Sequence, residues 1–371
     1  MSENRQGGYV FKALENLPDM SPDEIFGVLL PFEARWRDRQ QFLVTCGYML
    51  RPRYHPGWTP SWFGTGKHPI FFEDSITLPL TDHLIDATRI CDGAPVYIKR
   101  VKTGDNESQI ATMFSAPRLR TDPNNHCVPI LEVFQDADDK TISYMIMPCL
   151  RLIDRPPFER VIDVVDFVDQ MLEGLVFMHQ NGVAHRDCAY NNIMMDASML
   201  YPHGFHPIRG LRLPDGITFN KPLSRAGKPI KYYYVDFGIS VYFPQDVHPK
   251  LVVGVDGRDR DVPELSPDVP YDPFKVDVFI IGNLLIHRFY ETYSNINFLH
   301  PLLEWMTEID PAARPDALKA LELWKAIRSE VGSIQRRRRL WFRDEWWLIS
   351  VVVEIASLIT GVINMCRRAL R

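Results

Sequence analysis

The stretch Val183–Asp196, VAHRDCAYNNIMMD, combines a His-Arg-Asp triplet with an asparagine, Asn192, five residues after the aspartate Asp187. Phosphoryl transfer requires little covalent chemistry from the protein. It needs a carboxylate near the attacking hydroxyl, an oxygen ligand for a metal ion and accurate positioning. An Asp and an Asn five residues apart on one tight loop can fill both roles. The alternative is a surface turn in which these residues occur together by chance.

A second stretch, YYYVDFGIS at 232–240, offers another carboxylate. Its β-prone residues predict a strand that delivers Asp236, followed by Phe237 and Gly238. A carboxylate at the end of a strand can face a metal ion, and the glycine permits a sharp turn after it.

Five more residues fit the same chemistry, in chain order. Lys99 lies in the strand-like run VYIKR, where an ammonium group can reach phosphates, and Glu107 lies in the next predicted helix. Downstream, Glu264, Asp277 and Arg314 lie in the runs VPE, KVDVFIIG and DPAARP.

Composition limits the class of protein. The chain has 371 residues, of which 46% are hydrophobic and 24% charged, which suits a soluble globular protein of about two lobes. The formal net charge of −5 argues against general nucleic-acid binding. The six cysteines are scattered without metal-ligand spacing, and the first residues are polar, so we expect a reducing, cytoplasmic location without a secretory signal.

The pattern along the chain divides it into four regions. Residues 1–70 predict a helical extension and an ordered linker, 71–150 a β-rich region, and 151–332 a helical region with an insertion at 197–231. Residues 333–371 form a basic and hydrophobic tail. One helix is predicted to start at Ser21, and a second over 33–52, ending before Pro52. Further helices are predicted over 107–114, 161–180, 275–293 and 299–309. Strands are predicted over 75–80, 94–101, 130–135 and 141–147.

With these motifs in this order, the chain resembles a eukaryotic-type protein kinase domain from roughly residue 71 to 330. The phrases GYMLRPRY, NHCVP, HRDCAYNNIMMD and YPHGFHP resemble the kinase-like proteins expanded in mushroom-forming (basidiomycete) fungi. The resemblance implies an α+β, two-lobed protein-kinase-like fold, with a β-rich N-lobe and a helical C-lobe. To this fold the sequence pattern outside 71–330 adds an N-terminal helical extension and a C-terminal hydrophobic helix. The resemblance also implies ATP- and Mg²⁺-dependent phosphoryl transfer to a protein hydroxyl of Ser or Thr.

The resemblance assigns roles residue by residue. Asp187 matches the catalytic base, and Asn192 and Asp236 match the metal ligands. Lys99 matches the lysine that pairs with the α- and β-phosphates, and Glu107 matches its helical partner. The residues implied to bind the nucleotide are Lys99, Glu107, Met147 as the gatekeeper, Pro148 and Leu150 in the adenine hinge, and Met194.

A further set of residues matches the structural parts of the family's site. Asp277 matches the acid that anchors the catalytic loop, and Glu264 and Arg314 match a buried ion pair under the activation segment. The full structural set is His185, Arg186, Phe237, Gly238, Glu264, Asp277 and Arg314.

Four departures from the family pattern bear on activity. No glycine lies between Gly66 and Gly93, so the phosphate-cradling glycine loop is missing. Tyr97 stands where an alanine normally packs on adenine, and Ala189 stands where Ser/Thr kinases carry a lysine. Gly257 takes the place of a threonine. These departures favour the alternatives: an inactive pseudokinase scaffold, or a small-molecule kinase.

The insertion 197–231 carries six cations against one acid, Asp215. The cations are Arg209, Arg212, Lys221, Arg225, Lys228 and Lys231. Two interpretations remain open: a solvated loop, or a docking strip for an acidic partner or an acidic part of the chain itself.

The segment from Asp236 to Glu264 contains only two hydroxyl side chains, Ser240 and Tyr242. In kinases the Arg186 position usually waits for a phosphate on this segment. We expect a fixed carboxylate to replace that phosphate, so that no activating phosphorylation is needed. The candidates are Asp246, Asp256, Asp259 and Asp261.

The tail from 346 to 366 is mostly apolar and is flanked by arginines. That length can cross a bilayer as a helix, although Glu354 is costly in hydrocarbon. Three interpretations stay open: a tail anchor that also meets a partner helix, an amphipathic helix lying in the membrane plane, and a helix docked on the kinase body.

Overall fold

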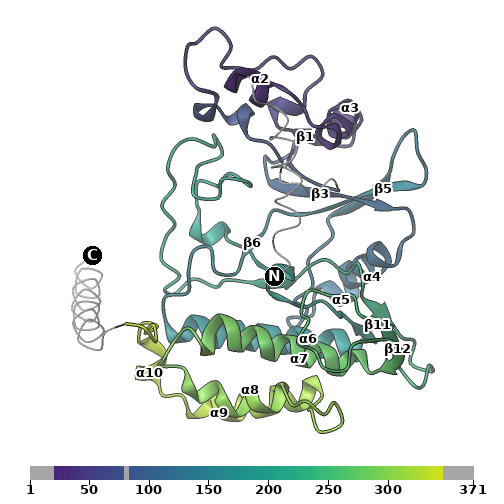
Figure 1. Ribbon diagram of the computed structural model, residues 1–371, viewed down its shortest axis with the longest axis vertical. Coiled ribbons are helices and arrows are strands. Elements are labelled where there is room, and N and C mark those ends of the chain that lie inside the picture. Colours follow the sequence, from purple (N-terminus) through teal and green to yellow (C-terminus); the bar gives the residue numbers. More distant parts are fainter. Residues whose placement is uncertain (1–20, 79–82, 346–371) are drawn as a thin grey trace. The chain divides into compact units, whose positions relative to one another are not determined.

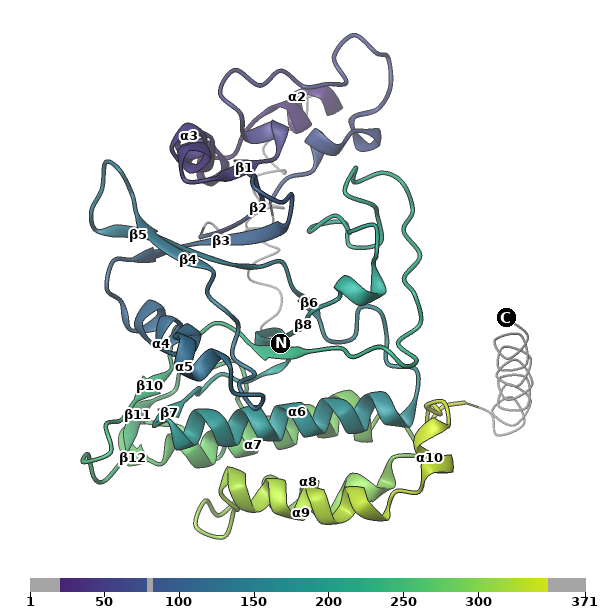
Figure 2. The same ribbon diagram turned by 180° about the vertical axis from the view of Figure 1, so that it is seen from behind.

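The computed structural model describes residues 21–78 and 83–345 (Figures 1 and 2). The chain forms two compact units, each of which mixes helices with antiparallel strands, so the fold is α+β. Of the described residues, the first unit contains those up to Asp105, Pro129–Cys149 and Leu200–Leu223. The second contains Asn106–Val128, Leu150–Met199 and the described residues from Ser224 onward. The predicted tail helix at 346–366 lies outside the described residues.

The first unit is built on a five-stranded antiparallel sheet. Its strand order is β1-β2-β3-β5-β4. Alternation explains the central strand, because Val96 and Ile98 of β3 are buried in the core while Tyr97 and Lys99 point to the other face. The strands are β1 (Tyr48–Leu50), β2 (Leu84–Arg89), β3 (Pro95–Lys102), β4 (Glu132–Gln135) and β5 (Ile142–Pro148).

The N-terminal helices follow their capping signals. Helix α2 (Pro22–Gly27) begins with a capping box in which Ser21 and Glu24 bond each other's backbone N–H groups. Helix α3 (Pro31–Thr45) is shorter than the helix predicted over 33–52. Gly47 adopts a φ of 92°, which ends the helix, and the following residues form strand β1 on the edge of the sheet instead.

The strand predicted over 75–80 is not found in its described part. Residues Glu73–Ser75 form a short 3₁₀ turn, and residues 76–78 have no regular structure. The hydrophobic alternation there has another use, because Ile76 and Leu78 are both buried. The pattern therefore marked packing rather than strand pairing.

The N-terminal extension is an integral part of the first unit. Trp36 and Leu43 of α3 lie in one hydrophobic core with Ile98 and Ile146 of the sheet. Beneath them, the fully buried Arg53 forms an ion pair with the fully buried Glu33, at 3.2 Å between Nε and Oε1. Arg53 also donates to the carbonyl oxygen of Asp74, and Glu33 accepts the N–H of Leu78, so this buried pair joins the extension to the residues that follow it.

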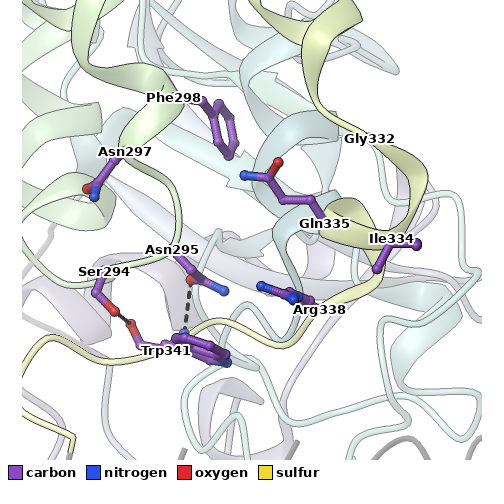
Figure 3. A pocket seen from close by; sticks show the side chains of 9 residues that line it. All are labelled: Ser294, Asn295, Asn297, Phe298, Gly332, Ile334, Gln335, Arg338 and Trp341. Carbon is purple, nitrogen blue, oxygen red and sulfur yellow. Dashed lines mark hydrogen bonds between the residues drawn. The ribbon is translucent and has the colours of Figure 1, made fainter. Parts of the chain in front are cut away.

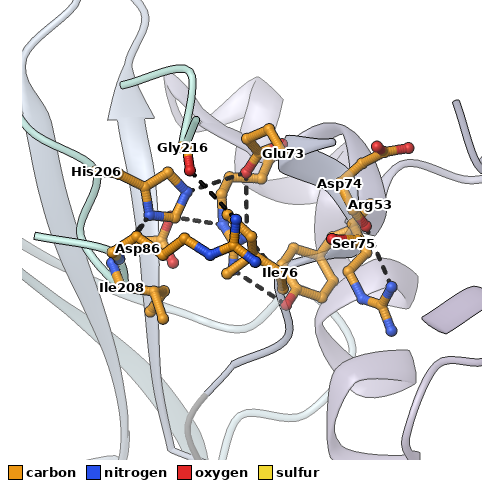
Figure 4. Close-up of polar contacts among 12 residues, drawn as sticks. Arg53, Glu73, Asp74, Ser75, Ile76, Asp86, His206, Ile208 and Gly216 are labelled. Carbon is orange, nitrogen blue, oxygen red and sulfur yellow. Dashed lines mark hydrogen bonds and ion pairs between the residues drawn. The ribbon is translucent and has the colours of Figure 1, made fainter. Parts of the chain in front are cut away.

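The insertion also contributes to the first unit (Figure 4). His206 is 1% exposed, and its Nε2 lies 3.2 Å from Glu73 Oε1, while Arg209 donates to the carbonyl oxygen of Ile70. Gly216 has a φ of 69°, and a Cβ there would come within 2.7 Å of Ile76. This close approach explains why the position needs glycine.

The second unit is mainly helical. Helices α6, α7, α8 and α9 run side by side in both views (Figures 1 and 2). The helices are α4 (Asn106–Ser115), α5 (Pro117–Arg120), α6 (Val161–Gln180), α7 (Pro273–Leu285), α8 (His300–Met306), α9 (Ala317–Glu330) and α10 (Ser333–Arg337). The strands are β6 (Arg151–Leu152), β7 (Val183–Ala184), β8 (Ile193–Met195), β9 (Tyr232–Tyr234), β10 (Val241–Tyr242), β11 (Val252–Gly254) and β12 (Ser266–Tyr271).

Helix α6 has the bounds that its apolar pattern predicts. It ends at Gln180, two residues before Gly182, whose φ is 77° and where a Cβ would lie 2.3 Å from the carbonyl oxygen of Phe243. Helix α7 stops earlier than predicted, because its last turn changes to a π-helix at Ile286–Tyr290. The long buried α6 supports the loop that follows it.

The insertion returns to the second unit as a buried anchor. Arg225 is 1% exposed and donates to the carbonyl oxygens of Ile153, Pro156 and Pro157, and its guanidinium lies 4.3 Å from the ring centre of Phe158. The interpretation of 197–231 as a solvated loop is therefore wrong for this part. Arg225 is also not available to an acidic partner.

Within residues 21–78 and 83–345, no helix is long and apolar enough to cross a membrane.

His126 links the second unit's stability to pH. Its side chain is 4% exposed and its Nδ1–H donates to the carbonyl oxygen of Tyr232 at 3.0 Å. Burial lowers the pKa of His126 to about 4. Because the unfolded chain binds a proton near pH 6.5 and the folded one does not, stability should fall as the pH drops from about 6.5 toward 4.

We expect the wild-type protein to lose on the order of 2 kcal/mol more stability between pH 7 and pH 5 than a His126→Asn variant does. The asparagine keeps a donor for Tyr232 and removes the titration. Urea unfolding at both pH values measures the difference, and equal losses in the two proteins would contradict the assignment.

Candidate functional site

The loop that carries the His-Arg-Asp triplet is anchored by one aspartate of helix α7. Asp277 is fully buried, and its two oxygens accept the backbone N–H groups of His185 at 2.7 Å and Arg186 at 2.6 Å. His179 at the end of α6 adds a third contact, at 3.0 Å from Nε2 to Asp277 Oδ2. A charged acceptor for two adjacent amides fixes the backbone of the loop.

Two residues of the predicted site hold strained backbone. Arg186 has a φ of 66° and Asp236 a φ of 64°. They are the two non-glycine residues with left-handed φ among residues 21–78 and 83–345. Such conformations persist only where the surroundings over-determine them, and they concentrate at functional sites.

Asp187 and Asn192 are in direct contact. The Asn192 side chain, which is buried, donates from Nδ2 to Asp187 Oδ2 at 2.7 Å and to the Asp187 carbonyl oxygen at 2.9 Å. Both of these bonds use the amide nitrogen and leave the amide oxygen available as a ligand. Two residues that are five positions apart in the sequence therefore form one hydrogen-bonded pair.

Strand pairing brings Asn192 and Asp236 to the same end of a small sheet. In the antiparallel pair β8–β9, Ile193 lies opposite Tyr234, and the N–H of Val235 donates to the carbonyl oxygen of Asn192 at 2.9 Å. Asp236 is the next residue. The register of this one strand pair therefore places the two predicted metal ligands, Asn192 and Asp236, near each other.

His185 and Phe237 fill the space beneath this loop. Both are buried, and their rings lie 5.0 Å apart between centroids, with Phe237 also packed on Phe114 of α4. The His185 Nε2–H donates to the carbonyl oxygen of Val235, and Nδ1 accepts the Asp187 N–H. Burial lowers the pKa of His185, and Asp277 and Asp187 oppose that effect.

The carboxylate of Asp187 is only partly open to solvent. Burial raises the pKa of Asp187, and the backbone N–H of Arg258, the charges of His185 and Arg258 and the Asn192 amide lower it. The Arg258 N–H donates to Asp187 Oδ1 at 2.7 Å. Sequence reasoning missed Arg258; the one signal available was Gly257 before it, in place of a bulkier residue.

Glu264 and Arg314 form a bidentate ion pair. Nη1 lies 2.5 Å from Oε1 and Nη2 lies 3.1 Å from Oε2. The Arg314 side chain is fully buried and that of Glu264 is 9% exposed. Arg314 Nε donates to the carbonyl oxygen of Glu308 and Nη1 to that of Lys275, so all three nitrogens of the guanidinium have partners.

The carboxylate expected beside Arg186 is not there. Within the described chain, the Arg186 guanidinium donates to neutral acceptors: the carbonyl oxygen of Ile239 at 3.1 Å, that of Val253 at 3.4 Å, and the Tyr271 hydroxyl at 3.3 Å. Two of the proposed carboxylates, Asp259 and Asp261, turn to Asn283 instead, and the expectation of a phosphate-replacing acid is wrong. Asn283 lies in α7, which the sequence predicts as a helix, but its contact with these two aspartates depends on the tertiary fold.

The remaining predicted residues lie in the two units separately. In the first unit, Tyr97 and Lys99 share one face of β3, and Met147 lies opposite Tyr97 on β5. Pro148 ends β5, on the core face with Val96. In the second unit, Leu150 is buried, Met194 lies in β8, and Glu107 lies in α4, 3.8 Å from the position that a Cβ on Gly238 would take.

The donor set fits Mg²⁺ that is bound together with phosphates. Among residues 21–78 and 83–345, no group of three or more His, Cys, Asp and Glu side chains is arranged to hold a metal ion. Asn192 and Asp236 provide one amide and one carboxylate oxygen, which are hard ligands, and Mg²⁺ usually takes its remaining ligands from water and substrate phosphates. Asn192 and Asp236 alone are too few to hold a metal ion without ligands from water or substrate.

A separate cavity of about 630 Å³ lies elsewhere in the second unit (Figure 3). It is lined by Ser294, Asn295, Asn297, Phe298, Gly332, Ile334, Gln335, Arg338 and Trp341. None of these residues belongs to the predicted site. Asn295 and Ser294 already bond the backbone of 339–341, so much of the lining serves to hold the chain after α10.

No protein-family model matches the chain, and no curated protein matches it. The functional conclusion therefore rests on the geometry of the loop 183–196, its neighbours and the motifs that the sequence carries.

Proposed function

We propose that this protein is a protein kinase of Ser or Thr hydroxyls that uses ATP and Mg²⁺, in a two-lobed kinase-like fold. One observation carries the proposal. Asp187 and Asn192 are locked together at 2.7 Å, on a backbone that Asp277 anchors through two amides, beside the strained Asp236. A stability role alone gives no reason to keep strained backbone and a partly buried carboxylate in one place.

In the proposed reaction, Asp187 receives a proton and the acceptor attacks phosphorus. The hydroxyl oxygen forms a bond to the γ-phosphorus of ATP, the bond from that phosphorus to the β–γ bridging oxygen breaks, and ADP leaves with the electron pair. The hydroxyl proton passes to an Asp187 oxygen. Each carboxylate oxygen of Asp187 accepts a bond already, yet a carboxylate offers about four lone-pair sites and can accept another.

Asn192 and Asp236 are the residues that would hold Mg²⁺ in this proposal. When bound, the ion neutralises charge on the phosphates and holds them for in-line attack. The Asn192 nitrogen is committed to Asp187, which orients the amide oxygen. In the first unit, Lys99 would add a positive charge for the α- and β-phosphates.

Loss of the Asp236 carboxylate should weaken Mg²⁺-dependent ATP binding. We expect the wild-type protein to be stabilised by ATP with Mg²⁺ and less by ATP alone, and an Asp236→Asn variant to lose most of the Mg²⁺-dependent part. A neutral amide is a weaker ligand for Mg²⁺ than a carboxylate. A thermal-shift titration with and without Mg²⁺ measures this.

Asp246→Asn provides a matched control, because Asp246 is exposed and lies in the same segment. Its Mg²⁺-dependent shift should equal that of the wild type. A wild-type protein that shows no such shift would defeat the enzyme proposal and favour a pseudokinase scaffold.

Activity should not depend on phosphorylation of the segment after Asp236. Both Nη groups of Arg186 already donate to neutral acceptors, and Ser240 is 2% exposed with its hydroxyl donating to the carbonyl oxygen of His185. We expect protein made in bacteria to be as active as protein from a fungal host. Parallel assays of both preparations check this; a large gap that phosphatase treatment removes, mapped to the exposed Tyr242, would refute it.

A further inference from the structure

The activation segment, 236–264, is held by two contacts with the catalytic loop, 183–196, and by one contact with Tyr271 of β12. The Arg186 guanidinium donates to the carbonyl oxygen of Val253, the Tyr271 hydroxyl donates to that of Gly254 at 2.7 Å, and the Arg258 N–H donates to Asp187 at 2.7 Å. Residues before and after Val255 are therefore both held. The position of Arg258 against Asp187 follows from this set of contacts.

Glycine at 257 makes the last contact geometrically possible. Its φ is 122°, a conformation that L side chains rarely adopt. A Cβ there would lie 3.2 Å from the Arg186 carbonyl oxygen and 3.8 Å from Asp187 Oδ1. The chain thus brings a backbone donor, rather than a side-chain hydroxyl, to the carboxylate.

The Arg258 side chain adds a charge to the same carboxylate. Its Nε lies 3.6 Å from Asp187 Oδ2, and the side chain is 53% exposed while that of Asp187 is 13% exposed. The guanidinium is close enough for attraction but beyond hydrogen-bond distance, so it keeps donors for a second anion. The loop itself has Ala189 two residues after Asp187 and offers no cation there.

We propose that Arg258 is a positioning residue of the acceptor site: its backbone N–H fixes one oxygen of Asp187, and its guanidinium supplies the positive charge that the catalytic loop lacks. This inference rests on the proposed kinase function. It places the positive charge beside Asp187 on Arg258 of the activation segment instead of on a residue of the catalytic loop. An anion arriving beside Asp187 would meet the free donors of Arg258.

The test compares Arg258→Ala, Arg258→Lys and Arg260→Ala in the full chain. Arg260 is the matched control, because it removes the same charge two residues away and its guanidinium bonds the Val255 carbonyl oxygen instead of Asp187. The assay follows transfer of radiolabelled phosphate from ATP to a degenerate Ser/Thr peptide library. Melting temperatures of all variants show that each is folded.

We expect Arg258→Ala to lower kcat by about tenfold or more with little change in the KM for ATP. Arg258→Lys should recover part of the loss, and Arg260→Ala should stay close to the wild type. Gly257→Ala should also lower kcat, because its Cβ pushes the Arg258 N–H away from Asp187.

Two other results overturn the inference in different ways. If the wild type transfers phosphate and Arg258→Ala is as active as Arg260→Ala, or more active than the wild type, Arg258 is a neutral contact or a cover over the site. If the wild type binds ATP with Mg²⁺ but transfers nothing, the kinase proposal fails and this inference fails with it.

Discussion

An Asp187→Asn variant is expected to lose phosphate transfer by on the order of 10³-fold while still binding ATP with Mg²⁺. The amide has the size of the carboxylate, and its oxygen can accept the N–H of Arg258. Asn192 loses its side-chain acceptor but keeps its bond to the backbone carbonyl oxygen of residue 187, so the loop should keep its shape. The amide cannot take up the hydroxyl proton. The measurement pairs peptide phosphorylation with the Mg²⁺-dependent thermal shift of the same preparation.

Binding without transfer would distinguish the proposed proton acceptor, Asp187, from the proposed metal ligands, Asn192 and Asp236. Asp236→Asn should lose both properties, whereas Asp246→Asn should lose neither. If Asp187→Asn transferred phosphate at the wild-type rate, Asp187 would not be the proton acceptor. The contact with Asn192 would then be structural only.

Local sequence signals predicted the parts of the site that strands and helices fix by themselves. Helix α6 spans Val161–Gln180 as its apolar spacing predicts, and strand β9 ends two residues before Asp236. The pairing of β8 with β9 then brings Asn192 next to Asp236 without further information. Motif spacing works here because each step depends on neighbours in the chain.

Contacts between distant segments escaped the sequence analysis. Strand β1 was predicted as the end of a helix, because its residues suit either state and only pairing with β2 decides. Arg225 looked like one cation among six, and its burial depends on carbonyl oxygens more than sixty residues away. The Arg258–Asp187 contact likewise depends on the path of the whole segment after Asp236.

The wrong expectation for Arg186 has a similar physical origin. A guanidinium needs acceptors, and the sequence near it offered four carboxylates. The structure uses carbonyl oxygens and one tyrosine hydroxyl, and Asp259 and Asp261 bond Asn283 of α7. Residue type constrains which bonds are needed, but tertiary structure selects the partner.

Removal of the Arg314 side chain should be among the most destabilising substitutions in the second unit. Arg314→Ala is expected to cost about 3–5 kcal/mol, because Glu264 would keep a buried charge without its partner. The carbonyl oxygens of Glu308 and Lys275 would lose their donors as well, and the ring of Phe279, 4.7 Å from the guanidinium, would lose its packing. Urea unfolding at pH 7 measures the change.

Arg328→Ala is the matched control, since Arg328 pairs with Asp169 at 3.0 Å but is 38% exposed. Asp169 keeps the Nε1–H of Trp324 as a donor at 2.6 Å when the half-exposed arginine is gone, so we expect a smaller loss, of about 1 kcal/mol. If the two variants unfolded together, burial would not be the source of the Arg314 effect. If Arg314→Ala matched the wild type, the ion pair would contribute nothing to folding. A Glu264→Gln variant completes the argument: it keeps an acceptor for Arg314, so its cost should lie between the other two.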